Sequence, residues 1–215
     1  SLPLNKGLPI ISGVCRGVAC AHEVGIRHGD LKPANVVISN RGVPKVIDFG
    51  AAAALMADTL PSSEIMGTRG YMPPEFYRSS RYGPLDLRSD VWALGVLMHL
   101  VLAGSHPYQL AEDANAVQWA DAIERLPDLA HAPAEVREII RKCLQPHKDN
   151  RYPDAGELGR DVDRLRNRLA TSPDGQRRAI LAQAISLFDE GKYAEALDLF
   201  NRAAEVTPHV NTHLW

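Results

Sequence analysis

The sequence His28-Gly29-Asp30-Leu31-Lys32-Pro33-Ala34-Asn35 is followed a short way along the chain by Asp48-Phe49-Gly50. Between them lie two β-branched runs, Val36-Val37-Ile38 and residues 43–47. The residues that separate these runs, Ser39-Asn40-Arg41-Gly42, include the Asn and Gly that favour a tight turn. The segment therefore predicts a small β-hairpin with polar residues at both of its ends.

Pairing of the two strands would bring the carboxylates of Asp30 and Asp48 and the amide of Asn35 around one cleft. Carboxylate and amide oxygens are the hard ligands that Mg²⁺ takes when it also binds substrate phosphates. Lys32 adds a charge that could stabilise a transferring phosphate, and a carboxylate without a metal can accept a proton from a hydroxyl. The cluster suggests phosphoryl transfer, although each residue taken alone is better interpreted as a turn residue.

Composition and charge narrow the class of protein. The 215 residues are 45% hydrophobic and 23% charged, as in globular proteins, and at roughly 150 residues per domain they suggest one domain and part of another. The net charge of −2 offers no positive excess for binding nucleic acid. The most apolar run, residues 91–104, is shorter than the roughly 20 residues of a membrane helix. We therefore expect neither a nucleic-acid partner nor a membrane segment in this chain.

The three cysteines, Cys15, Cys20 and Cys143, lack the spacing of a zinc or redox motif. We interpret them as small buried apolar groups in a protein of the reducing cytoplasm.

Apolar periodicity predicts a mainly α (α+β) fold, in which only the hairpin is β. Residues 91–103 are apolar almost all round, which indicates a helix enclosed by protein. Residues 50–84 show little periodicity and are interpreted as a long ordered loop. The other predicted helices cover residues 10–24, 111–126, 133–144, 155–169, 179–190 and 193–207.

In order and spacing, residues 28–35 and 48–50 resemble the catalytic loop and metal-binding motif of protein kinases. Residues 67–75 resemble the end of an activation segment, with Pro73 in place of the usual Ala, and residues 90–95 resemble the start of the family's buried central helix. The resemblance runs from about Ile10 to Leu169. This part of the chain is identified as the C-terminal lobe of a eukaryotic-type (Hanks-type) serine/threonine protein kinase.

The resemblance implies a role for each of several residues. Asp30 would be the catalytic base, Lys32 would contact the γ-phosphate of ATP, and Asn35 and Asp48 would hold Mg²⁺. Thr68 would hydrogen-bond toward Asp30 and Lys32, as in the serine/threonine-specific branch, and the substrate would be a protein. Structural roles are implied for His28, Phe49, Gly50, Glu75 with Arg151 as its ion-pair partner, and Asp90, which would hold the catalytic-loop backbone or simply cap its helix.

Two departures from the family pattern matter. Gly29 stands where most members carry an arginine that pairs with a phosphorylated activation segment. We therefore predict that Thr59, Ser62 and Ser63 do not activate by docking onto a catalytic-loop arginine. No Gly-rich loop, strand lysine or partner glutamate precedes Ile10, so the N-terminal lobe is expected to be absent and the fragment inactive by itself.

Two other functions stay open. His28-Gly29-Asp30 also resembles small-molecule phosphotransferases of kinase-like fold. A pseudokinase or scaffold that binds partners without catalysis is the second alternative, against which the retention of Asp30, Lys32, Asn35 and Asp48 argues.

The last part of the chain follows the spacing of a tetratricopeptide repeat. The residues that carry this pattern are Ala184, Gly191, Tyr193, Ala196, Phe200, Ala203 and Pro208. Any amphipathic helical hairpin is the alternative, and a single repeat needs neighbours beyond Trp215 or a surface to pack on. The predicted organisation is a kinase C-terminal lobe over 1–170, a linker over 171–177 and a truncated α-helical hairpin over 178–215 that could bind peptide partners.

Overall fold

The computed structural model describes residues 1–49, 69–111 and 113–206. The chain divides into two compact units, Ser1–Asp163 and Arg164–Trp215. The boundary between the two units falls within helix α8 (Ala155–Thr171). Gly50, Thr59, Ser62, Ser63, Thr68 and Pro208, all named in the sequence-based predictions, lie outside the described residues.

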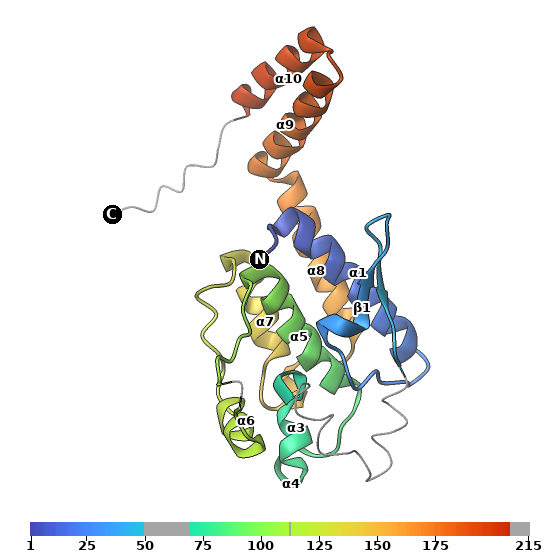
Figure 1. Cartoon of the computed structure of the whole chain (residues 1–215), viewed down its shortest axis with the longest axis vertical. Helices are drawn as coiled ribbons and strands as arrows, with labels where there is room; N and C mark the ends of the chain where they lie inside the picture. The colour runs from blue at the N-terminus through green and yellow to red at the C-terminus, as the bar shows by residue number, and fades with distance from the viewer. Residues whose placement is uncertain (50–68, 112, 207–215) are drawn as a thin grey trace, which may run out of the picture. The chain divides into compact units, whose positions relative to one another are not determined.

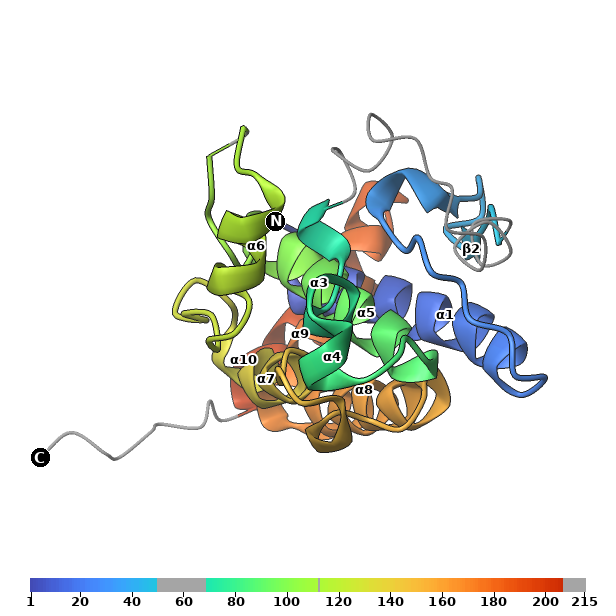
Figure 2. The same cartoon turned by 90° about the horizontal axis from the view of Figure 1, so that it is seen from below.

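Helix α5 (Leu87–Ala103) is the centre of the first unit and is buried along most of its length. It begins at Asp86, whose Oδ1 accepts a hydrogen bond from the Arg88 N–H at 2.9 Å, and it ends at Gly104 with φ +82°. In Figures 1 and 2, α5 lies between α1 (Leu4–His22) and α7 (Arg137–Cys143). The predicted enclosed helix is confirmed, with its start four residues earlier than the apolar run.

The close packing of α5 on α7 depends on Gly95. A Cβ at this position would lie 2.5 Å from the Cβ of Cys143, which no packed side chain tolerates.

The predicted hairpin is formed by β1 (Val36–Ile38) and β2 (Pro44–Val46). The strands are antiparallel, with Val36 opposite Val46 and Val37 opposite Lys45. The hairpin lies against α1, where a Cβ at Gly17 would come within 3.2 Å of the Val46 side chain. Val37 therefore faces away from α1, since side chains alternate along a strand.

The prediction of a loop over residues 50–84 is wrong for the part that the structure describes. Three short helical segments lie there: η2 (Arg69–Tyr71), α3 (Pro74–Tyr77) and α4 (Ser79–Tyr82). Pro74 occupies the first position of α3, where its fixed φ favours a helix start. The other helical segments that the structure describes in the first unit are η1 (Pro33–Asn35), α6 (Ala116–Ala122), η3 (Ala134–Val136) and η4 (Lys148–Asn150).

The cysteines differ in environment. Cys15 and Cys143 are buried as predicted, whereas Cys20 is exposed on the outer side of α1, so the prediction was wrong for Cys20. Burial raises the pKa of the Cys15 thiol to about 12, which leaves it protonated and unreactive at neutral pH. Across the described residues, no helix combines the length and the apolar character that crossing a membrane requires.

In the second unit, α9 (Pro173–Asp189) and α10 (Tyr193–Glu205) pack against each other. Small residues, Ala184, Ala196 and Ala203, are buried between them. The predicted linker over 171–177 is helical in the structure apart from Ser172. Ser172 starts α9, because its hydroxyl accepts a hydrogen bond from the Gly175 N–H at 3.0 Å and so caps the helix.

Candidate active site

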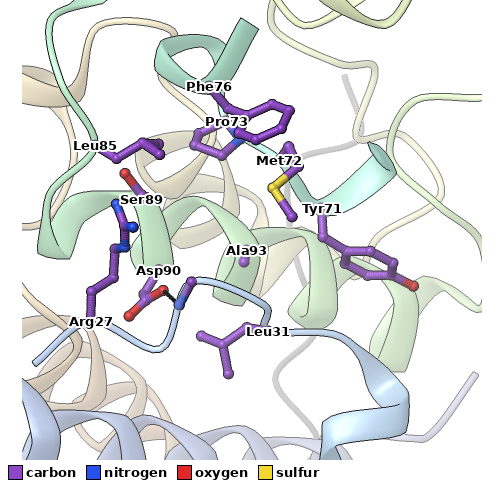
Figure 3. A pocket seen from close by; sticks show the side chains of 11 residues that line it. Arg27, Leu31, Tyr71, Met72, Pro73, Phe76, Leu85, Ser89, Asp90 and Ala93 are labelled. Carbon is purple, nitrogen blue, oxygen red and sulfur yellow. Dashed lines mark hydrogen bonds between the residues drawn. The ribbon is translucent and has the colours of Figure 1, made fainter. Parts of the chain in front are cut away.

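Asp90, in the first turn of α5, holds the loop that contains Asp30. The Asp90 carboxylate accepts hydrogen bonds from the backbone N–H of His28 at 2.7 Å and of Gly29 at 2.9 Å. Figure 3 shows this carboxylate aimed at the loop. Asp90 is only 1% exposed, and the cap of α5 is Asp86 rather than Asp90. The buried negative charge is thus stabilised by N–H donors that also fix the backbone just before Asp30.

His22, at the end of α1, supplies a third donor to Asp90. Its Nε2 lies 3.0 Å from Asp90 Oδ2, and its Nδ1 accepts from the Ala155 N–H at 3.2 Å. Since a backbone N–H can only donate, we assign the neutral ring with its proton on Nε2. The sequence suggested no role for His22 beyond packing. The sequence feature that could have indicated such a role is a histidine on the apolar face of a predicted helix, because a buried polar group requires a hydrogen-bond partner.

His28 links the same loop to the end of the hairpin. The side chain is fully buried, and its Nε2 donates to the Ile47 carbonyl at 3.0 Å while its Nδ1 accepts from the Asp30 N–H at 3.3 Å. Its ring also packs on Phe49, with 4.6 Å between centroids. His28 therefore fixes Asp30 relative to the chain that leads to Asp48.

The structure brings Asp30, Lys32 and Asn35 together at the start of the hairpin. Lys32 Nζ lies 2.7 Å from Asp30 Oδ2, and Asn35 Nδ2 donates to both the backbone oxygen of Asp30 at 2.7 Å and its Oδ2 at 3.1 Å. The Asp30 side chain is 18% exposed, so it can be reached from solvent. This arrangement suits a carboxylate that accepts a proton beside a cation that can contact a phosphate.

Asp48 follows β2 and has φ +65°, the left-handed region that Asp tolerates better than most residues. The Ile47 N–H donates to the Asn35 carbonyl at 3.0 Å, which joins the two ends of the hairpin near Asp48. With its NH₂ group turned toward Asp30, Asn35 keeps its amide oxygen available for a metal.

A carboxylate and an amide oxygen fit Mg²⁺ that binds mainly through phosphates and water. Among the described residues, no group of three or more His, Cys, Asp or Glu side chains could hold a metal alone.

Two exposed apolar side chains beside these polar groups were missed from the sequence. Val37 is 45% exposed and Ile47 is 43% exposed, although both belong to a hairpin that packs on α1. Val37 lies on the face of the hairpin that points away from α1. An apolar surface next to a cluster of polar residues that could bind phosphates can support the flat base of a nucleotide.

Glu75 and Arg151 form a buried ion pair with both side chains fully enclosed. Arg151 Nη1 and Nη2 each donate to a different oxygen of Glu75 at 2.8 Å, and Ser89 Oγ also donates to Glu75 Oε1 at 2.9 Å. The pair thus ties α3 to the segment before α8 and to the first turn of α5.

A small pocket separates the catalytic loop from η2 and α3 (Figure 3). Leu31 lies on one side, and Tyr71 and Met72 lie on the other, with α5 forming the floor. Arg27 lies beside Asp90 in the same view, and its Nε is buried without a hydrogen-bond partner in the part of the chain that the structure describes. Among the described residues that line this pocket, Arg27 is the one cation.

This geometry agrees with the sequence profile that the chain matches, which is described as "Protein kinase domain" and covers residues 4–158. The chain belongs to the protein kinase family. Among the similar proteins, "Serine/threonine-protein kinase PknB" of Mycolicibacterium smegmatis is 33% identical to this chain over 191 residues, which cover 83% of this chain and 30% of that protein.

Other relatives of the kinase carry similar names. "Probable serine/threonine-protein kinase PknB" of Corynebacterium glutamicum is 34% identical over 73% of this chain and 25% of its own length. "Serine/threonine-protein kinase PknL" of Mycobacterium tuberculosis is 31% identical over 79% of this chain and 43% of its own length. The chain thus spans less than half the length of each of these proteins.

Proposed function

We propose that the protein is a serine/threonine protein kinase, which transfers the γ-phosphate of ATP to a Ser or Thr hydroxyl of a protein substrate. The observation that carries the proposal is the cluster at the hairpin, where Lys32 and Asn35 both bind the reachable carboxylate of Asp30. The names of the relatives, which are serine/threonine-protein kinases, support the class of substrate.

In the proposed reaction, the Asp30 carboxylate accepts the proton of the substrate hydroxyl. The hydroxyl oxygen forms a bond to the γ-phosphorus while the bond from that phosphorus to the β,γ-bridging oxygen breaks, so that ADP leaves with the electron pair. Lys32, already 2.7 Å from Asp30, is close enough to stabilise the charge on the transferring group. The Asn35 side-chain amide donates to both the backbone oxygen and the carboxylate of Asp30, which keeps the carboxylate oriented.

Asn35 and Asp48 are the residues that would hold Mg²⁺, which when bound would neutralise charge on the phosphates. Asn35 directly precedes β1 and Asp48 follows β2, so the phosphates would lie between Asp30 and Asp48. The exposed side chains of Val37 and Ile47 would then lie under the adenine base.

The test uses the protein at its natural length, with radiolabelled ATP, a protein substrate and small-molecule acceptors offered side by side. We expect the protein substrate to be labelled, and Asp30→Asn to lower the rate by about 100-fold or more, since a general base contributes about 10² to 10⁴. Glu138→Gln, an exposed carboxylate far along the chain, serves as the matched control and should leave the rate unchanged.

Three results would contradict the proposal. Labelling of small molecules alone would indicate the phosphotransferase alternative. An unchanged rate in Asp30→Asn would remove its role as base. Binding of partners without any Mg²⁺-nucleotide binding, and therefore no loss in Asp48→Ala, would indicate a scaffold. The 215 residues alone are expected to be inactive, because no Gly-rich loop or strand lysine that could align ATP precedes Ile10 in them.

We also propose that α9 and α10 form a tetratricopeptide-like repeat that binds peptide segments of partners. Support comes from the small residues at the contact of the two helices, Ala184, Ala196 and Ala203, and from Gly191 with φ +78° at their turn. Ala184→Leu should separate the helices and lower their helical signal in circular dichroism. An unchanged spectrum and melting curve would argue against this packing.

A further inference from the structure

His106, in the connection between α5 and α6, reaches across to η2. Its Nε2 lies 3.0 Å from the carbonyl oxygen of Gly70. On the opposite side of the ring, Nδ1 lies 3.1 Å from the backbone nitrogen of Tyr108 and 2.7 Å from the Tyr108 oxygen. One side chain thus connects two segments that lie more than thirty residues apart in sequence, at Gly70 and at residues 106–108.

The hydrogen bonds decide which nitrogen carries the proton. The Tyr108 N–H can only donate, so it requires an unprotonated Nδ1, and the proton of the neutral ring is then on Nε2. Burial lowers the pKa of His106, although the nearby backbone oxygens of Tyr108 and Gly70 act to raise it, and the lowered pKa favours the neutral ring at pH 7. The other neutral form, with the proton on Nδ1, would donate to the Tyr108 oxygen at 2.7 Å but would leave both the Gly70 oxygen and the Tyr108 N–H without a partner on the ring. His106 Nε2–H is therefore the donor to Gly70.

Aromatic rings hold this donor in place. The imidazole lies edge-on to Tyr71 at 6.0 Å and to Trp119 of α6 at 5.4 Å between centroids. Gly70 permits the close approach, because a Cβ there would lie 3.0 Å from His106 Nε2 and 3.2 Å from Trp119. The ring has no room to turn away from the Gly70 carbonyl, so the contact works as a fixed anchor.

The anchored segment faces the catalytic loop. Tyr71 and Met72, which directly follow Gly70, form the wall of the pocket opposite Leu31 (Figure 3). Leu31 is the neighbour of Asp30 in the chain. The segment whose backbone His106 holds is therefore in a position to contact a polypeptide that presents a hydroxyl to Asp30.

We propose that His106 is a positioning residue for the protein substrate, which it affects by fixing the backbone at Gly70 through its Nε2–H. This inference rests on the proposed kinase function. It predicts that loss of the Nε2 donor weakens the binding of the protein substrate and leaves the binding of ATP unchanged, since Lys32, Asn35 and Asp48 lie on the hairpin.

Two matched variants separate this role from simple packing. His106→Gln can place an amide NH₂ near the position of Nε2, whereas His106→Asn reaches only the position of Nδ1. Steady-state rates are measured with the natural-length protein, ATP and a serine peptide selected from a positional library with the wild type. We expect His106→Asn to raise KM for the peptide by about 3- to 10-fold, as the loss of one hydrogen bond would. In His106→Asn, KM for ATP and kcat should stay within about twofold of the wild-type values. In His106→Gln, KM for the peptide should also stay close to the wild-type value.

Equal values of peptide KM in the Asn and Gln variants would overturn the proposal, as would an equal rise in KM for ATP. A second measurement does not need activity and so distinguishes failure of this inference from failure of the kinase function. Nitrogen-15 NMR of the 215-residue chain should show His106 protonated on Nε2. Hydrogen exchange at the Met72 amide, which donates to Arg69 in η2 at 3.1 Å, should accelerate in His106→Asn and not in His106→Gln. A proton on Nδ1, or equal exchange in both variants, would refute the role of His106.

Discussion

Replacing Glu75 by Gln should destabilise the first unit strongly, because Glu75 neutralises a fully buried arginine. The Arg151 guanidinium has no exposed surface, and Glu75 supplies two of its hydrogen bonds. Removing one partner of such a pair costs about 3–5 kcal/mol, since the other charge is left uncompensated. Arg151 would still donate to the backbone oxygens of Arg88, Gln145 and Pro146. We therefore expect the lower end of the range, about 3 kcal/mol.

The assay is urea unfolding followed by tryptophan fluorescence in a Trp215→Phe background. Trp92 is a direct reporter, because the Arg151 guanidinium carbon lies 5.0 Å from its ring centroid. For a chain of this size, 3 kcal/mol should also lower Tm by roughly 6 to 12 °C. The control is Glu138→Gln, which breaks the exposed pair with Arg141 and should cost less than about 1 kcal/mol. A loss below about 1 kcal/mol in Glu75→Gln would refute the argument that the buried charge needs its partner.

Three further predictions concern single side chains. Gly29 has φ +78°, so Gly29→Ala should lower the free energy of unfolding by about 1–2 kcal/mol. Because Gly29 directly precedes Asp30, the variant should also reduce the rate of phosphoryl transfer. Gly25→Ala is the control, because Gly25 has φ +74° and open space around it. This variant should lose the same stability without a change in the rate of phosphoryl transfer. Equal losses of rate in the two variants would contradict a specific role of Gly29. Asp90→Asn should lower kcat about tenfold or more by loosening the loop before Asp30, and an unchanged kcat would refute it.

Burial acts to raise the pKa of Asp86, but hydrogen bonds from Arg88 and Lys148 outweigh it and lower the pKa to about 2. The stability that the ionised Asp86 adds should therefore be complete above pH 3.8 and disappear toward pH 2. The measurement is the difference in free energy of unfolding between the wild type and Asp86→Asn as a function of pH. A difference that does not change with pH would contradict the prediction.

The parts of the fold predicted from the sequence share one property, which is a pattern that neighbouring residues repeat. The apolar run of α5 and the β-branched runs around residues 39–42 are of this kind, and both elements formed where expected. The four-residue helices α3 and α4 are too short to show periodicity, so the same reasoning interpreted them as loop.

The candidate site shows the same division. Asp30, Lys32 and Asn35 lie within six residues of one another in the sequence, and in the structure both Lys32 and Asn35 contact the Asp30 carboxylate. The contacts of His22 and His106 each join segments more than thirty residues apart, to Asp90 and to Gly70. Nothing local in the sequence distinguishes such a histidine from one that only packs, because its partners are fixed by the tertiary fold.

The rigidity of the site cannot come from the hairpin that carries it. Strands of three residues are too short to be stable by themselves in water. The fixed geometry around Asp30 must instead come from the buried contacts of Asp90 and His28, which connect the loop to α5 and to the end of β2. Asp90 can serve in this way only because α5 is itself enclosed by α1 and α7. The geometry around Asp30 therefore depends on the packing of α5 in the core beneath it, and we expect mutations that loosen α5 to impair the proposed phosphoryl transfer before they unfold the chain.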